Sequence, residues 1–78
     1  MTLRDRLRAT FARAFELEDS VGTEDLRYQS LPGWDSIGHM VLVAAIEEDF
    51  GVELGIEQTM DLKSFDGAVE LLEELGAA

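Results

Sequence analysis

The sequence of 78 residues contains no cysteine, which excludes disulfide stapling, thiolate zinc sites and a cysteine nucleophile. Basic residues are also scarce: six Lys and Arg stand against 17 Asp and Glu, for a net charge of −11. Because nucleic-acid-binding proteins normally neutralise phosphates with Lys and Arg, we expect no nucleic-acid partner. No apolar run approaches the length of a membrane span, and the charged residues 1–6 are unlike a signal peptide. We therefore expect a cytoplasmic protein without membrane insertion.

The length fits a single domain over residues 1–78, and we expect it to be a monomer. A chain this short buries only about 60% of its unfolded surface, so it builds one small core and no deep active-site cleft. Hydrophobic residues make up 46% of the chain and charged residues 29%, a balance that favours a folded globular domain over disorder.

The charge is spread unevenly along the chain. Residues 1–34 carry six acids and five bases, whereas residues 35–78 carry eleven acids and a single base, Lys63. This asymmetry suggests partners with basic docking surfaces that meet the second part of the chain. A role in solubility alone would produce the same composition, so that alternative stays open.

The first helix is predicted from residue 3 to about residue 16. Thr2 and Asp5 resemble a capping box, with Asp in place of the usual Glu or Gln. The apolar residues recur at helical spacing and form one stripe: Leu3, Leu7, Phe11, Ala14 and Phe15. We expect this stripe to face the core.

A long connection follows over residues 17–35, and a loop this long in a compact domain is often functional. Pro32 and Gly33 predict a turn near its end. Its apolar residues are expected to pack against the helices: Leu17, Val21, Leu26, Tyr28, Leu31 and Trp34. Asp35 or Ser36 then supplies the N-cap of a second helix, since either side chain accepts a hydrogen bond from an unpaired backbone N–H.

The second helix is expected to end near Phe50, where Gly51 supplies a stop signal. Nine of the fourteen residues from 37 to 50 are apolar, with seven in a row at 40–46. A helix that is apolar on most faces is central to the fold or uses its surplus surface for binding. The stripe assigned to the core consists of Leu42, Ala45 and Ile46. A second stripe, called the free stripe below, consists of Met40, Val41 and Ala44.

The remaining residues predict an extended segment, one short helical turn at about 57–61 and a last helix. Val52, Leu54 and Ile56 alternate with polar residues or glycine and are expected to enter the core. Ser64 is the expected N-cap of the last helix, which Gly76 ends. The apolar face of that helix comprises Phe65, Ala68, Val69, Leu72 and Leu75. Together these segments predict an all-α fold, a small antiparallel four-helix bundle with three main helices and one short helix.

The segment at residues 33–40 resembles the phosphopantetheine attachment motif of the acyl carrier protein family. The core of the family motif reads Asp-Ser-Leu, and this chain has Asp35-Ser36-Ile37. The second helix finishes at residues 45–51 with an apolar-acidic-acidic-Phe pattern similar to the family's. The last helix opens with Ser64-Phe65, similar to the family's hydroxyl-plus-apolar pair. The resemblance covers essentially the whole chain.

The resemblance implies an acyl-carrier-like fold and a carrier that is not itself an enzyme. A phosphopantetheinyl transferase would attach 4′-phosphopantetheine from coenzyme A to Ser36, and Asp35 would help the transferase to engage that serine. The arm would hold an acyl or aminoacyl intermediate as a thioester for loading, synthase or tailoring enzymes. We predict a partner surface made of Met40, Val41, Ala44, Glu47 and Glu48. No metal site is expected.

The physical chemistry of the motif agrees with this implication. A serine in the first turn of a helix projects its hydroxyl outward, beside backbone N–H groups that lack intrahelical partners. A phosphodiester formed there lies at the positive end of the helix dipole, which favours an anion. Gly33 and Gly38 are expected to keep bulk away from both flanks of the site.

Three departures from the family pattern bear on the pathway. Many fatty-acid-type carriers have acids two and five places after the serine, where this chain has Gly38 and Val41. The proline frequent near the end of the second loop is replaced by Gly55. These differences favour a stand-alone carrier of a specialised pathway (polyketide, modified fatty acid or peptide) over the housekeeping fatty-acid carrier.

Other interpretations stay open. If Ser36 is only an N-cap, the chain is a small acidic helical adaptor that docks a protein partner through its second helix. An acidic mimic of nucleic acid is a third possibility. A catalytic set of Ser36, His39 and Asp35 is disfavoured, because one helix face supplies neither an oxyanion hole nor a cleft. We expect His39 at the surface near the arm and Trp34 in the packing of the core.

Overall fold

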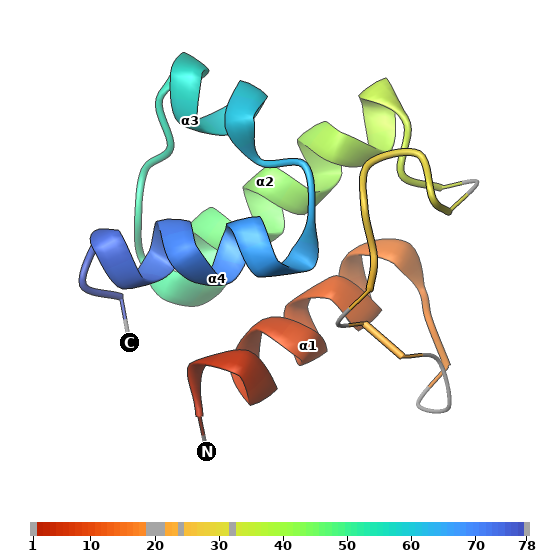
Figure 1. Ribbon diagram of the computed structural model, residues 1–78, viewed down its shortest axis with the longest axis horizontal. Coiled ribbons are helices and arrows are strands. Elements are labelled where there is room, and N and C mark those ends of the chain that lie inside the picture. The colour runs from red at the N-terminus through yellow and green to blue at the C-terminus, as the bar shows by residue number, and fades with distance from the viewer. Residues whose placement is uncertain (1, 19–21, 24, 32, 78) are drawn as a thin grey trace.

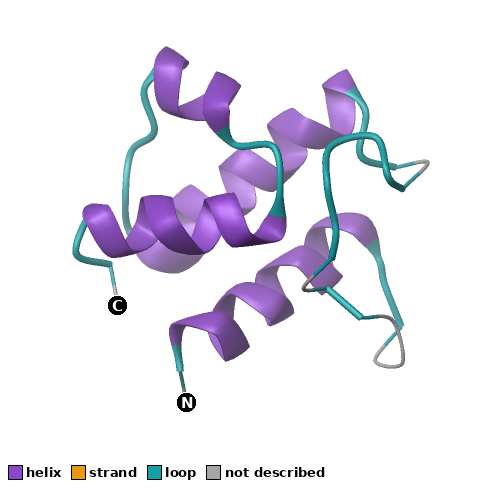
Figure 2. Cartoon of the chain, in the orientation of Figure 1, coloured by secondary structure: helices purple, strands orange, loops and turns teal. Residues whose placement is uncertain are grey.

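The computed structural model describes residues 2–18, 22–23, 25–31 and 33–77. Within them lie four helices, α1 (Leu3–Phe15), α2 (Ser36–Phe50), α3 (Ile56–Asp61) and α4 (Phe65–Glu74). Loops join the helices, and no strand occurs in the part of the chain drawn in colour in Figure 2. This confirms the predicted all-α bundle of three main helices and one short helix. Val21 and Pro32, the latter part of the predicted turn, fall outside the described residues.

Local hydrogen bonds begin and end the helices where the sequence predicts. At the start of α1, the Thr2 hydroxyl accepts the Asp5 N–H at 3.1 Å and the Asp5 carboxylate accepts the Thr2 N–H at 3.3 Å, which completes the capping box. Gly51 ends α2 with a φ of 64°, a left-handed conformation that glycine adopts without a Cβ penalty. The Ser64 hydroxyl accepts the Gly67 N–H at 2.9 Å and caps α4.

Helix α1 packs mainly against α2, which runs in the opposite direction (Figure 1). Helix α4 crosses in front of α2 in the same view, and α3 lies above α4 near the top of the picture. The buried core draws on α1, α2, α4, the long connection before α2 and the short link between α3 and α4: Leu7, Phe11, Leu26, Trp34, Leu42, Val43, Ile46, Leu62, Phe65, Ala68, Val69 and Leu72. None of the described helices combines the length and the hydropathy that a bilayer span requires.

The two stripes of α2 separate as predicted. Leu42, Ala45 and Ile46 are buried. The free stripe faces outward, with Met40 and Val41 58% and 48% exposed and Ala44 also exposed. The prediction of which face of α2 is buried and which is exposed is therefore confirmed.

The long connection before α2 is tied to the link between α3 and α4. The Tyr28 N–H donates to the Lys63 carbonyl at 2.7 Å, and the Phe65 N–H donates to the Leu26 carbonyl at 2.9 Å. Trp34, at the end of the connection, is fully buried against Phe11, with ring centroids 5.4 Å apart. These contacts place the connection beside the start of α2.

Two apolar residues do not lie where the sequence predicts. Alternation with its neighbours predicts that Ile56 enters the core, but its side chain is 81% exposed. The reason is that α3 begins at this residue, and the helical turn directs the side chain away from the core. Val52 and Leu54 are partly buried against the core, as expected. Leu75 is 38% exposed, since it is the C-cap of α4 and the chain leaves the helical path at the next residue, Gly76, which has a φ of 70°.

A polar cluster joins α1 to the end of α2. The Thr10 hydroxyl donates to one carboxylate oxygen of Asp49 at 2.6 Å, and the Arg13 guanidinium contacts the other oxygen at 2.8 Å. The hydrogen bond from Thr10 lowers the pKa of Asp49, and Arg13 and Arg6 lower it further against the opposing effect of burial. Asp49 therefore contributes to stability as a carboxylate.

Replacing Thr10 with valine should lower the free energy of unfolding at pH 7 by about 1.5–3 kcal/mol, the range for hydrogen bonds to charged groups. Because the folded pKa of Asp49 lies below its ordinary value of 3.8, this stabilisation is present above pH 3.8 and is lost as the pH falls through the folded value. Urea unfolding of both proteins at pH 7 and pH 3 measures the difference. Thr10→Ser, which keeps the hydroxyl, is the control. An equal loss at both pH values would show that the Asp49 carboxylate is not the partner that matters.

Candidate functional site

The start of α2 shows which of the two candidate residues caps the helix. The Asp35 carboxylate accepts the Gly38 N–H at 2.8 Å, and Asp35 has the extended backbone of an N-cap. Ser36 is the first residue of α2 and is exposed. Its Oγ lies 3.4 Å from the Tyr28 hydroxyl, and it does not accept a capping N–H. The serine is therefore not needed to cap the helix.

A hollow with a volume of about 360 Å³ opens beside Ser36. It lies between the start of α2, the end of α3 and the long connection, and most of its surface is apolar. Its lining consists of Tyr28, Ser36, His39, Met40, Thr59, Met60, Leu62 and Lys63. The serine hydroxyl thus borders a space large enough for an extended organic group.

His39 joins three segments of the chain, which corrects the expectation that it is a surface residue. The Trp34 indole N–H donates to Nδ1 of His39 at 3.0 Å, and Nε2 of His39 lies 2.7 Å from the Thr59 carbonyl oxygen. Because an indole N–H only donates, Nδ1 must accept, and Nε2 then carries the proton that is donated to Thr59. The planes of the two rings are nearly parallel, at an interplanar angle of 11°, with ring centroids 6.3 Å apart. His39 therefore ties the connection and α3 to α2, while Trp34 packs in the core as predicted.

The same contacts argue against the catalytic set of Ser36, His39 and Asp35. Both ring nitrogens of His39 are engaged by Trp34 and Thr59, and the Asp35 carboxylate is engaged by the Gly38 N–H. No hydrogen bond joins Ser36 to His39 within the described residues. A nucleophile without a base in reach has no activation.

Gly38 is required for a different reason from the one that the sequence suggested. A Cβ built at this position would overlap the carbonyl oxygen of Gly33, so α2 and the connection approach each other too closely for any side chain. A Cβ at Gly33 would meet only the Phe15 ring, at 3.8 Å, an ordinary contact distance. Gly38 therefore permits close backbone packing beside Ser36.

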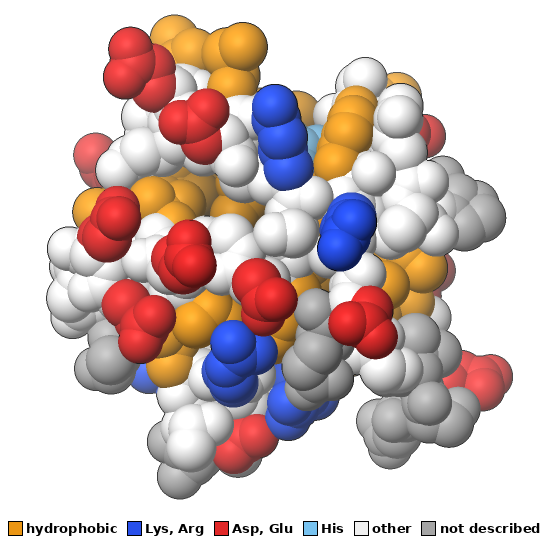
Figure 3. Space-filling model, viewed as in Figure 1, with side chains coloured by type: hydrophobic (Ala, Val, Ile, Leu, Met, Phe, Trp, Pro, Cys, Tyr) orange, Lys and Arg blue, Asp and Glu red, His pale blue; other side chains and the backbone are white. Residues whose placement is uncertain are grey.

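The acids at the end of α2 have separate roles. Glu48 is exposed, whereas Glu47 is half-buried and its carboxylate accepts the Leu54 N–H at 2.9 Å. Asp49 faces α1, as described above. Of the two glutamates in the predicted partner surface, Glu48 makes no such bond to the residues that the structure describes. Figure 3 shows further Asp and Glu side chains spread over the face that α4 crosses.

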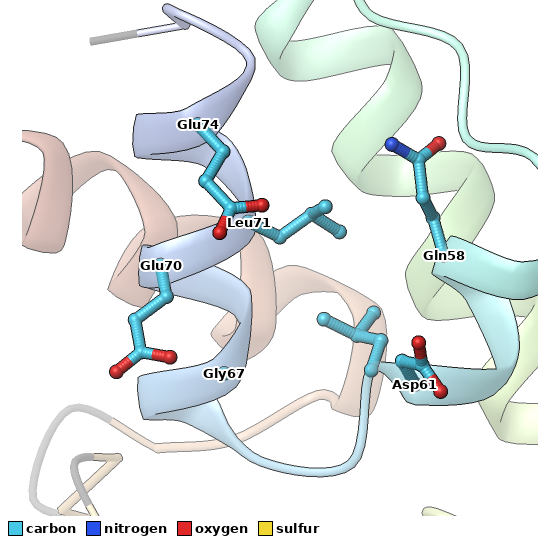
Figure 4. A pocket seen from close by; sticks show the side chains of 7 residues that line it. Gln58, Asp61, Gly67, Glu70, Leu71 and Glu74 are labelled. Carbon is cyan, nitrogen blue, oxygen red and sulfur yellow. The ribbon is translucent and has the colours of Figure 1, made fainter.

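A second hollow, of about 250 Å³, lies between α3 and α4. Figure 4 shows Leu71 pointing from α4 toward α3, with Gln58 and Asp61 on α3 and two glutamates on α4. No serine lines this hollow. Across the described residues, no group of three His, Cys, Asp or Glu is placed to hold a metal ion. The hollow beside Ser36 is therefore the better candidate for a functional site.

Sequence reasoning missed several residues that line the candidate site: Tyr28, Thr59, Met60 and Lys63. Tyr28 was expected only to pack, and no local pattern marks its hydroxyl as a neighbour of Ser36. Tyr28 and Lys63 reach the site because the connection pairs with the α3–α4 link. That pairing joins residues far apart in the sequence.

Comparison with known proteins identifies the family. Residues 5–72 match the family model described as the phosphopantetheine attachment site. No curated protein and no solved structure matches the chain. Members of this family bear 4′-phosphopantetheine, are modified by a phosphopantetheinyl transferase, and interact with enzymes without being catalysts themselves. Because the match spans most of the chain, the chain belongs to the phosphopantetheine attachment site family and is a non-catalytic carrier of the acyl carrier protein type.

Proposed function

We propose that Ser36 carries the phosphopantetheine arm and that Asp35 helps the transferase to engage it. The observation that carries this proposal is that two neighbouring residues at the start of α2 have different roles. Asp35 caps the helix, whereas the Ser36 hydroxyl is exposed and accepts no capping N–H. The alternative in which Ser36 serves only as an N-cap loses its structural basis, since the helix already has a cap.

The residues around Ser36 fit a phosphopantetheine group. An exposed hydroxyl is available for the ester bond, and an apolar hollow beside it leaves space for the arm. In the attachment reaction, Ser36 Oγ forms a new O–P bond and loses its proton to the transferase, while the pyrophosphate bond of coenzyme A breaks and adenosine 3′,5′-bisphosphate leaves. When attached, the group supplies a thiol that holds the cargo as a thioester. Cysteine is absent, so this chain has no thiol of its own.

The direct test is the intact mass of the protein after incubation with a broad-specificity transferase and coenzyme A. One added phosphopantetheine group, located on the peptide that contains Ser36, supports the proposal. No addition under conditions that modify a control carrier favours the adaptor interpretation instead.

We propose that the cargo is an acyl or aminoacyl intermediate of a specialised pathway rather than of housekeeping fatty-acid synthesis. Two places after Ser36, an acid is sterically excluded, because any side chain at Gly38 would overlap the Gly33 carbonyl. Five places after Ser36, Val41 presents an apolar surface that is 48% exposed. Recognition at the start of α2 is therefore less electrostatic than in carriers with acids at both places. The mass spectrum of the natively isolated protein identifies the cargo.

We also propose that partner enzymes dock on the free stripe and the acids after it. Met40, Val41 and Ala44 are exposed beside Ser36, and Glu48 adds a carboxylate one turn further along α2. Glu47 was assigned to the same surface and contributes less, since its carboxylate is bonded to the loop after α2. We expect a cytoplasmic monomer, and sedimentation equilibrium measures the oligomeric state.

Salt should stabilise the protein while slowing its encounter with a basic partner. Ten of the eleven net negative charges lie after residue 34, and their repulsion is screened over about 8 Å at physiological ionic strength. The melting temperature of the apo protein should rise as sodium chloride increases from near zero to moderate concentration. The association rate with a loading or synthase enzyme should fall over the same series, because screening weakens electrostatic steering. An association rate that does not change with salt would show that the acidic residues after position 34 serve solubility only.

A further inference from the structure

Tyr28 is contacted from two sides, and its hydroxyl lies near Ser36. Its ring meets the rings of Trp34 and His39 edge-on, with interplanar angles of 90° and 80°. Its backbone N–H donates to the Lys63 carbonyl at 2.7 Å, which fixes the residue from a second side. The phenol oxygen then lies 3.4 Å from Ser36 Oγ. Packing of the ring alone does not require the hydroxyl to be at this place.

Lys63 borders the same hollow as Ser36 and Tyr28. It is the only base after residue 34, in a segment with eleven acids. No carboxylate of the described residues forms an ion pair with it. Its exposed ammonium group is therefore available to an anion at the mouth of the hollow.

Modification of Ser36 would add negative charge to the most acidic part of the chain. The new phosphodiester would lie beside the Asp35 carboxylate, and repulsion between like charges disfavours such a pair. A hydroxyl donor and a cation at the same mouth offset that cost through charge-assisted hydrogen bonds. On the basis of the function proposed above, we propose that Tyr28 and Lys63 together hold the phosphodiester on Ser36 and so fix the root of the arm.

Modification of Ser36 would also determine the direction of the hydrogen bond between Tyr28 and Ser36. In the unmodified protein either hydroxyl can donate to the other. Once Ser36 Oγ is an ester oxygen, it has no proton and only accepts. Tyr28 must then donate, either to that oxygen or to a free oxygen of the phosphate. Tyr28→Phe removes this donor and keeps the ring that packs on Trp34 and His39.

The test compares the apo and holo forms of four proteins: wild type, Tyr28→Phe, Lys63→Gln and the matched control Arg27→Gln. Arg27 is an exposed base next to Tyr28 that does not line the hollow. The phosphorus NMR resonance of each folded holo protein is compared with that of the same protein unfolded in urea. The melting temperatures of the apo and holo forms are measured in low salt.

In the wild type and in Arg27→Gln, the folded resonance should differ from the unfolded one and should be broader. In Tyr28→Phe and Lys63→Gln it should narrow and move toward the unfolded position. The holo-minus-apo difference in melting temperature should also fall in these two variants, with little change in the apo values. This double difference separates contact with the phosphodiester from a purely structural role, which would lower the apo and holo values equally.

Unchanged resonances in both variants overturn the proposal while leaving Ser36 as the attachment site. A changed resonance in only one of the two variants overturns the claim that Tyr28 and Lys63 hold the phosphodiester together. If the wild type takes up no phosphopantetheine, no phosphorus signal is present, and that result refutes the proposed function itself. Equal shifts in the apo and holo melting temperatures assign Tyr28 to packing alone.

Discussion

Replacing Ser36 with alanine should abolish phosphopantetheine attachment and leave the fold nearly unchanged. The variant lacks the oxygen that forms the ester bond. It keeps the Asp35 cap of α2, and alanine is a favourable residue within a helix. Because Ser36 is exposed, the free energy of unfolding should change by no more than about 0.5 kcal/mol. Intact mass after treatment with a transferase measures the first effect, and urea unfolding measures the second.

Ser64→Ala is the matched control for this prediction. Ser64 also precedes a helix, but its hydroxyl caps α4 by accepting the Gly67 N–H. Its replacement should cost about 0.5–2 kcal/mol of stability and leave the modification intact. The two serines should therefore show opposite results. Attachment that persists in Ser36→Ala, or that maps to Ser20, Ser30 or Ser64, would refute the assignment.

Replacing Leu42 with alanine should destabilise the protein by roughly 2–5 kcal/mol, the range for truncation of a buried leucine. Leu42 is fully buried in the core, and a domain this small cannot collapse around the cavity without loss of packing. A loss of this size is a large part of the total free energy of unfolding of a small domain. Urea unfolding at neutral pH measures the effect.

The adjacent Val41→Glu should give the opposite result. Val41 belongs to the free stripe and is 48% exposed, so a glutamate there remains hydrated and the stability changes little. Binding to a partner enzyme should weaken by roughly tenfold, since about 1.4 kcal/mol is enough for that change and burying a carboxylate against an apolar surface costs at least as much. Titration calorimetry with that enzyme measures the loss. Equal destabilisation by the two substitutions would mean that α2 is rotated differently from the structure described above.

The helices and the attachment motif could be predicted from the sequence because they depend on local chemistry. The capping box of Thr2 and Asp5, the stop at Gly51 and the cap at Ser64 each satisfy hydrogen bonds or backbone angles within a few residues. The two stripes of α2 follow from helical periodicity alone. Ile56 shows where this reasoning fails: alternation with its neighbours predicts burial, whereas the start of α3 at this residue turns it outward.

The amino-acid sequence alone predicts the order and ends of the helices, the face of α2 that is buried and the serine at the start of that helix. The surroundings of that serine depend on the tertiary structure. Tyr28 lies at Ser36 because the connection pairs with the link before α4, and His39 is half-buried because Trp34 and Thr59 meet on either side of its ring. Periodicity and capping act over a few neighbouring residues. The contacts around Ser36 instead join loop segments that only the packing of the whole chain brings together.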